Sequence, residues 1–230
     1  MTPLKQDARL MLCLGVVLLI IALIGFSPRY IFPIFSGQYS MPSLWMHPHA
    51  ALSTLWLLIF IAQPYLIGKN DYSLHKRFGY FAVIIAAANT ATGIILQIDL
   101  LPAITDQQML NDAGFRLFAS TPNFIIYFVA ALILRKKVSF HMRYMYFATI
   151  APVEAAMNRI LVYLLDISPA VAGPLIGLWH LLLIMVVLIY DKNQNGKVHA
   201  ATWWGLGGFI LIQIIAINII GTSWWQQISV

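Results

Sequence analysis

Cysteine and charge are both scarce in this chain of 230 residues. Cys13 is the single cysteine, so an internal disulfide bond is excluded. Charged residues make up 10% of the chain and apolar residues 60%, whereas soluble domains carry about 25% charged residues. The mean hydropathy is +0.80. A water-facing surface cannot be built from this composition, and we therefore predict a membrane protein.

Several motifs of known chemistry are also missing. The chain has no G-x-x-x-x-G-K-[ST] run for a nucleotide phosphate and no H-E-x-x-H pair for a catalytic zinc ion. It also lacks a G-x-S-x-G nucleophile elbow and a lysine within the last apolar run. The net charge of +6 comes from only 14 basic residues against 8 acidic ones. This low density of basic residues does not favour a nucleic-acid partner.

Long apolar runs dominate what is present. A helix needs about 20 apolar residues to cross a hydrocarbon core of about 30 Å. Seven runs of suitable length occur, over Leu10–Phe26, His49–Ile67, Phe78–Ile98, Leu117–Leu134, Met142–Leu165, Ala170–Tyr190 and Ala201–Thr222. The connections are too short for a second domain. We therefore predict an all-α fold, a seven-transmembrane-helix bundle forming one domain over residues 1–230.

The first apolar run has a second interpretation, because Lys5 and Arg9 precede it as basic residues precede the core of a secretory signal. The run is long, however, and it ends at Gly25-Phe26-Ser27-Pro28 without an A-x-A cleavage site. We therefore expect it to remain as the first membrane helix.

Basic residues are distributed unevenly between the two sides of the predicted bundle. With a cytoplasmic N-terminus, the outer side holds only Arg29, Arg116 and Arg159. The inner side then holds Lys5, Arg9, Lys69, Lys76, Arg77, Arg135, Lys136, Lys137, Arg143, Lys192 and Lys197. The positive-inside rule predicts a cytoplasmic N-terminus and an outer C-terminus.

An eight-residue pattern, H-x-R-aromatic-x-Y-F-A, occurs twice, at 75–82 and at 141–148. Both copies begin a helix that leaves the predicted cytoplasmic face. The pattern is compatible with three helical hairpin repeats, over 48–98, 117–165 and 170–222, of the kind known in transport proteins. Convergence on a common interfacial motif is the alternative.

The basic residues of this pattern have two possible roles. Basic and aromatic side chains commonly reach the lipid headgroups and anchor helix ends. A more specific role follows from the exposed N–H groups at a helix N-terminus, which suit a phosphate. The residues that would then bind a lipid headgroup are His75, Arg77, His141 and Arg143, and membrane lipids are the predicted partners.

A motif of Leu74 to Gly79, L-H-K-R-F-G, follows a helix that carries His49, Trp56 and Gln63. These features resemble a loose group of bacterial multi-pass proteins with a His, Trp and Gln in one span before an L-H-R-x-L-G motif, as in DUF2306-type membrane proteins. Lys76 separates the histidine from the arginine, where the group has them adjacent. The resemblance implies the bacterial inner membrane and no defined reaction.

Ionisable residues within a membrane span are costly and commonly functional. Glu154 is the only glutamate, and it lies at a depth of about 15 Å, as His180 does on the next span. Asn89 and Gln213 fall at a similar level. We therefore predict a polar layer centred on Glu154 and His180, with a bend of the fifth helix at Pro152.

Other polar residues extend this layer toward the outer face. Asn158 follows Glu154 by one helical turn, Arg159 points toward the outer surface, and His49 lies near the mouth of the predicted cavity. The predicted ligand-binding residues are Asn89, Asn158, Gln213, His49 and Arg159. Glycines at Gly93, Gly173 and Gly177 are expected to permit close helix packing.

The first functional hypothesis is an outward-opening polar cavity for a small ligand or for proton-coupled transport, with Glu154 exchanging a proton and His180 as its partner. A purely structural pair that braces two helices is the alternative role of the same residues. A second hypothesis is an oxidoreductase with b-type haem or another metal, which needs histidines at matching depth. A metal-dependent hydrolase has the least support, because no metal-ligand motif is found. Cofactor, ligand and oligomeric state are not assigned by the sequence.

Overall fold

The protein is described by a computed structural model that covers residues 3–228. Within this range seven helices are long and apolar enough to cross a membrane, namely Pro3–Phe35, Met46–Gly68, Tyr72–Ala103, Gln107–Ile133, Val138–Leu164, Pro169–Asn195 and Ala200–Ile220. Each corresponds to one predicted run, and the described residues contain no strand. The all-α seven-helix fold class is confirmed, and the chain is an integral membrane protein. The sidedness of its termini stays a prediction.

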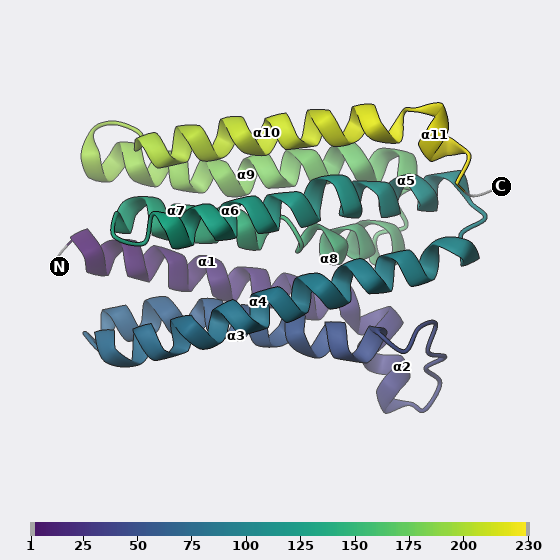
Figure 1. Cartoon of the computed structure of the whole chain (residues 1–230), viewed down its shortest axis with the longest axis horizontal. Coiled ribbons are helices and arrows are strands. Elements are labelled where there is room, and N and C mark those ends of the chain that lie inside the picture. The colour runs from purple at the N-terminus through teal and green to yellow at the C-terminus, as the bar shows by residue number, and fades with distance from the viewer. Residues whose placement is uncertain (1–2, 229–230) are drawn as a thin grey trace. The chain divides into compact units, whose positions relative to one another are not determined.

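The chain divides into two compact units, Met1–Leu100 and Leu101–Val230, where the sequence predicted one domain. Unit 1 contains α1 (Pro3–Phe26), a π-helical turn (Ser27–Ile31), α2 (Phe32–Phe35), α3 (Met46–Gly68) and α4 (Tyr72–Leu100). Helix α3 packs against both α1 and α4 (Figure 1). We describe each unit by itself.

Close packing of α1 on α3 depends on Gly15. A Cβ atom at this position would lie 2.9 Å from Cγ1 of Ile61 and 3.1 Å from the Phe60 ring. The connection from α3 to α4 is a tight turn in which Asn70 has a φ of 61°. Asp71 then accepts a hydrogen bond from the Leu74 N–H at 2.9 Å, which caps the start of α4.

The described part of unit 2, residues 101–228, contains ten helical elements, several of them short. They are η2 (Leu101–Ala103), α5 (Gln107–Phe115), the π-helical turn η3 (Arg116–Ser120), α6 (Thr121–Ile133), α7 (Val138–Ile150), α8 (Glu154–Arg159), the π-helical turn η4 (Ile160–Leu164), α9 (Pro169–Asn195), α10 (Ala200–Ile220) and α11 (Ser223–Gln226). Helices α6 and α7 form a hairpin, and α10 packs against α7 and η3 (Figure 1).

The core of unit 2 is built where large rings meet glycines. Phe147 on α7 is fully buried and its ring occupies the space that a side chain at Gly205 on α10 would need. Tyr127 on α6 donates a hydrogen bond to the Gly205 carbonyl at 2.6 Å. Trp225 on α11 fits in the same way over Gly114. Glycine thus sets how closely α10 and α11 approach their neighbours.

Candidate functional site

The fifth membrane span is interrupted just before Glu154. Helix α7 ends at Ile150 and α8 begins at Glu154. Pro152 has no N–H and cannot continue the α-helical ladder, and the Glu154 N–H donates instead to the Ala151 carbonyl at 3.2 Å. The predicted bend is found as a break between two helices. The Ile150 carbonyl therefore lacks its usual partner four residues on.

Glu154 is a buried carboxyl group with incomplete hydrogen bonding. Glu154 is 5% exposed, and its Oε2 atom has no hydrogen-bond partner among the described residues. Two side chains of the preceding span share this property, since Ser120 Oγ and Asn123 Oδ1 are also buried without a partner. Ser120 lies within reach of Glu154, although the two do not form a hydrogen bond of good geometry. Three buried oxygen atoms with unused capacity therefore lie on two adjacent spans.

A second carboxylate, Asp112, lies near Glu154 and is fully partnered. Its Oδ2 accepts from Asn158 Nδ2 and its Oδ1 from Gln108 Nε2, both at 3.3 Å. The charges of Asp112 and Arg116 both act on Glu154. The predicted ligand residue Asn158 thus joins Glu154 in one polar group. We call this group, together with Asn123 one turn after Ser120, the Glu154 cluster. It consists of Asp112, Arg116, Ser120, Asn123, Glu154 and Asn158.

Several residues of the Glu154 cluster lie within or beside irregular helical segments. Arg116 and Ser120 are the two ends of the π-helical turn η3, and the helix break immediately precedes Glu154. Asn158 lies in the last turn of α8, which the π-helical turn η4 follows at Ile160. Single π-helical turns are frequent at functional sites because they redirect side chains within an otherwise regular helix.

His180 has partners of its own. It is 2% exposed, and its Nε2 lies 3.3 Å from the Ile150 carbonyl oxygen left by the helix break. A carbonyl oxygen only accepts, so Nε2 carries the hydrogen. The ring lies 4.8 Å from Trp179 and 5.1 Å from Phe209, centroid to centroid.

The structure shows no direct hydrogen bond between Glu154 and His180, and their predicted partnership stays a prediction. Both residues are buried in unit 2, but no hydrogen bond joins them among residues 3–228. The reason is the break at Pro152, because it gives His180 a backbone acceptor and leaves Glu154 with the Glu154 cluster.

Two further predicted ligand residues lie elsewhere in unit 2. Gln213 on α10 has a buried Oε1 without a partner in the described part of the chain. Arg159 donates from its NH1 to the Ala155 carbonyl at 2.7 Å, one turn back along α8. Neither observation by itself identifies a ligand.

His49 and Asn89 belong to unit 1, and the structure brings them together through Ser53. Ser53 Oγ donates to Asn89 Oδ1 at 2.8 Å and lies 3.4 Å from His49 Nε2. The other imidazole nitrogen, Nδ1, lies 3.4 Å from Thr92 Oγ1. The His49 ring also packs on Gly93, where an added Cβ would lie 2.9 Å away. This polar cluster joins α3 to α4, and its polar side chains find most of their hydrogen-bond partners within the cluster.

The two histidines of the repeated pattern make equivalent contacts. His75 Nδ1 lies 3.4 Å from the Gln63 carbonyl at the end of α3. His141 Nδ1 lies 2.9 Å from the Ala131 carbonyl at the end of α6. Each histidine therefore links the start of its helix to the end of the preceding one, which braces a helical hairpin. The sequence suggested contact with headgroups, and these backbone contacts were not foreseen.

The two arginines of the same pattern differ completely. Arg77 is exposed, as a residue that reaches lipid headgroups would be, and its predicted role there stays a prediction. Arg143 is 1% exposed and forms an ion pair with Asp191 on α9. Its guanidinium therefore faces the protein interior, not the headgroups.

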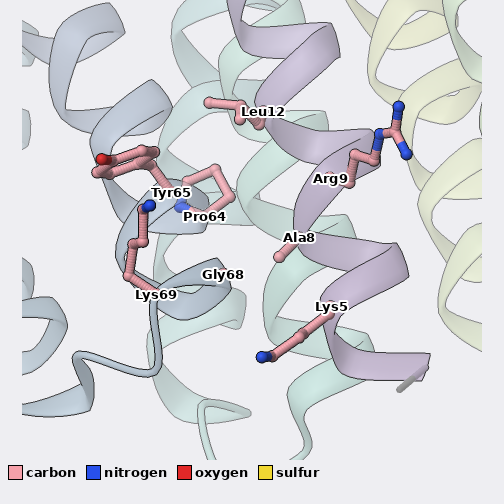
Figure 2. Close-up of a pocket in the computed structure, with 8 residues that line it drawn as sticks. All are labelled: Lys5, Ala8, Arg9, Leu12, Pro64, Tyr65, Gly68 and Lys69. Carbon is pink, nitrogen blue, oxygen red and sulfur yellow. The ribbon is translucent and has the colours of Figure 1, made fainter. Parts of the chain in front are cut away.

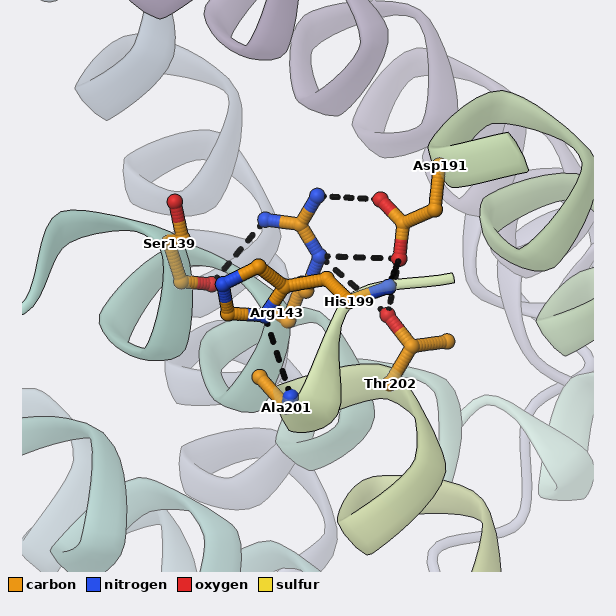
Figure 3. A network of polar contacts seen from close by, with 6 residues as sticks. All are labelled: Ser139, Arg143, Asp191, His199, Ala201 and Thr202. Atoms are coloured by element: carbon orange, nitrogen blue, oxygen red, sulfur yellow. Dashed lines mark hydrogen bonds and ion pairs between the residues drawn. The ribbon is translucent and has the colours of Figure 1, made fainter. Parts of the chain in front are cut away.

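The Arg143–Asp191 ion pair is the centre of a buried network (Figure 3). Arg143 Nε lies 3.3 Å from Asp191 Oδ2 and 3.2 Å from Thr202 Oγ1, and NH1 donates to the Ser139 carbonyl at 3.1 Å. Thr202 Oγ1 and the His199 N–H also donate to Asp191 Oδ2. The network ties α7, α9 and the start of α10 together.

Sequence reasoning did not find this network. The available signal was Asp191, an acidic residue at the end of the sixth span on the side where basic residues collect. A carboxylate in that position needs a cationic partner once it is buried. Thr202 gave no such signal, since a threonine within an apolar run commonly bonds to its own helix.

Comparison with protein-family models, with curated proteins and with solved structures finds no match for this chain. The resemblance to DUF2306-type membrane proteins therefore stays a prediction. Among residues 3–228, no three His, Cys, Asp or Glu side chains gather as they would around a metal ion.

Proposed function

We propose that this integral membrane protein binds a small polar ligand at the Glu154 cluster and couples that binding to proton exchange on Glu154. The observation that carries the proposal is the Glu154 carboxyl group itself, which is buried inside a membrane-spanning segment with one oxygen atom unpartnered. Burial of such a group without a compensating hydrogen bond is unfavourable. Ionisable groups in this position commonly mark a site or a pathway.

The chemistry of the unpartnered atoms suggests the type of ligand. Glu154 Oε2 and Asn123 Oδ1 accept hydrogen bonds, and the Ser120 hydroxyl can accept as well. A ligand that carries N–H or O–H donors would satisfy all three. Asp112 has amide donors of its own, so Glu154 is the carboxyl group left to exchange a proton with the ligand.

The position of the Glu154 cluster along the spans suggests how it opens. Asp112 is the sixth residue of α5, which places it about 8 Å along the axis from the start of that helix. On the predicted topology this end of the span faces outward. Asp112 would then be the member of the Glu154 cluster closest to the outer membrane surface, and we propose that the ligand enters from outside.

The test is proton flux into liposomes that contain the purified protein and a pH-sensitive dye. We expect flux with the wild-type protein and a fall of about tenfold or more in Glu154→Gln, since a group that transfers protons contributes at least this much. Asp99→Asn removes an exposed carboxylate and serves as the matched control, which should keep the wild-type rate. Equal rates of proton flux in the wild type and in Glu154→Gln would contradict the proposal.

The haem or metal oxidoreductase remains the alternative proposal for function. It requires a ligand nitrogen from histidine, and His180 Nε2 is engaged by the Ile150 carbonyl. An optical spectrum of the gently solubilised protein tests it directly, because a b-type haem has a characteristic absorption.

A further inference from the structure

A cavity of about 280 Å³ lies in unit 1, between the first turns of α1 and the last turns of α3 (Figure 2). All of its lining residues belong to unit 1, whereas the Glu154 cluster belongs to unit 2. Its charged lining is Lys5, Arg9 and Lys69, and its apolar lining includes Leu12 and Pro64. The cavity therefore combines a basic part with an apolar part.

Small residues keep this space open. Gly68 is the last residue of α3 and lines the cavity, and no atom lies within 4 Å of the position that its Cβ would occupy. Ala8 lines the cavity from α1. Farther along α1, Gly15 brings that helix into close contact with Phe60 and Ile61. The two helices are thus tightly packed at Gly15 and leave room near their ends.

The charged side chains that line the cavity are all basic. The lining contains no Asp or Glu, and among residues 3–228 the salt bridge that is formed joins Arg143 to Asp191 instead. Lys69 Nζ lies 5.6 Å from the centre of the Tyr65 ring, which holds its ammonium group beside the cavity. Figure 2 shows Arg9 turning its guanidinium away from α3, so Lys5 and Lys69 are the cations available to a ligand.

The depth of the lining residues matches the parts of a phospholipid. Lys5 lies in the first turn of α1, and Lys69 directly follows the end of α3. Both are at the ends of membrane-spanning helices, where headgroup phosphates lie. Leu12 is seven residues farther along α1, or about 10 Å deeper. Basic cavities between membrane helices are suited to anionic headgroups.

We infer that this cavity binds the phosphate of an anionic ligand between Lys5 and Lys69, and that Leu12 and Pro64 contact the apolar part of that ligand. A phosphate could come from a lipid or from a soluble ester. The apolar lining favours the phospholipid, with its glycerol and the upper part of an acyl chain beside Ala8 and Gly68.

The test is native mass spectrometry of the full chain in detergent, after delipidation and incubation with phosphatidylglycerol or with phosphatidylcholine. We expect wild-type protein to retain phosphatidylglycerol preferentially. The double variant Lys5→Gln/Lys69→Gln should lose about tenfold or more of this retention, because each cation contributes to attraction of an anionic lipid. Gly68→Leu keeps both cations but fills the open space, and it should lose retention as well.

The control is Lys136→Gln/Lys192→Gln, which removes two exposed lysines and changes the net charge equally. It should bind phosphatidylglycerol as the wild type does. If the two double variants lose lipid retention equally, retention depends on the overall charge of the protein, and the proposed site is overturned. Displacement of the lipid by soluble glycerol 3-phosphate at the same concentration would assign the phosphate site to a soluble ester and overturn the lipid assignment. Retention by Gly68→Leu at the wild-type level would place the lipid outside the cavity.

Discussion

Arg143 on α7 and Asp191 on α9 form an ion pair in which both side chains are almost fully excluded from solvent. Asp191 also accepts from Thr202 and from the His199 backbone. The carboxylate therefore accepts from Thr202 on α10, from the backbone N–H just before α10 and from Arg143 on α7. Such complete hydrogen bonding is what makes a buried ion pair tolerable.

Removing one partner of this pair should destabilise unit 2 strongly. We expect Asp191→Ala to lower the free energy of unfolding by about 3 kcal/mol or more, because an uncompensated guanidinium stays buried. Thermal unfolding in detergent measures the change. Arg77→Ala, at the equivalent and exposed position of the repeated pattern, is the control and should change stability by less than about 0.5 kcal/mol. A similar loss in both variants would contradict the structural role of the pair.

Gly205 and Gly207, two residues apart on α10, should differ in their response to replacement by alanine. At Gly205 the new methyl group would overlap the Phe147 ring, and we expect a loss of about 1 to 3 kcal/mol. At Gly207 no atom lies within 4 Å of the added Cβ, so Gly207→Ala should be neutral or stabilising by up to about 1 kcal/mol. Unfolding of the two single variants under the same conditions checks the contrast. Tolerance of Gly205→Ala without loss would mean that α10 packs less closely on α7.

The hairpin contact of His141 predicts a modest effect on stability. His141→Ala removes the contact with the Ala131 carbonyl and should cost about 1 kcal/mol. Lys136→Ala, in the adjacent connection, changes an exposed side chain and should cost much less. If His141 instead acts only on lipid headgroups, its replacement would leave unfolding unchanged and alter lipid retention. Measuring both properties on the same sample separates the two roles.

Glu154 and Asp112 should differ when each is replaced by an apolar residue. Glu154→Met removes an unpartnered buried oxygen atom, so we expect the free energy of unfolding to rise by about 1 kcal/mol. Asp112→Leu strands the amide donors of Asn158 and Gln108, so we expect a loss of about 1 to 2 kcal/mol. Thermal unfolding of both variants is the measurement. A destabilised Glu154→Met would favour a purely structural role for Glu154.

The spans and the helix break were predictable because they depend on local properties. Apolar length alone defines a membrane helix, and Pro152 interrupts the ladder wherever it stands in a helix. The burial of Glu154 followed from the same reasoning. These features require no knowledge of which helices are neighbours.

The partners of the polar side chains were not predictable in this way. The sequence gives the depth of Glu154 and His180 but not their rotation, and the backbone carbonyl of Ile150 was the acceptor that His180 met. The glycines make the same point. Gly173 and Gly177 were expected at helix contacts, yet no atom lies within 4 Å of either Cβ position. Gly205 and Gly114 have that role instead, because packing partners are set by the tertiary arrangement.

The 48 positions between Arg143 and Asp191 also affect how the protein is made. Arg143 leaves the ribosome first, and its guanidinium has no carboxylate to join until the sixth span has been synthesised. Until then the guanidinium is best accommodated at the membrane–water surface, because an unpaired charge inside the membrane is costly. The buried network of unit 2 can therefore form only after α9 and the start of α10 have been made, so the order of synthesis affects how the bundle reaches its final form.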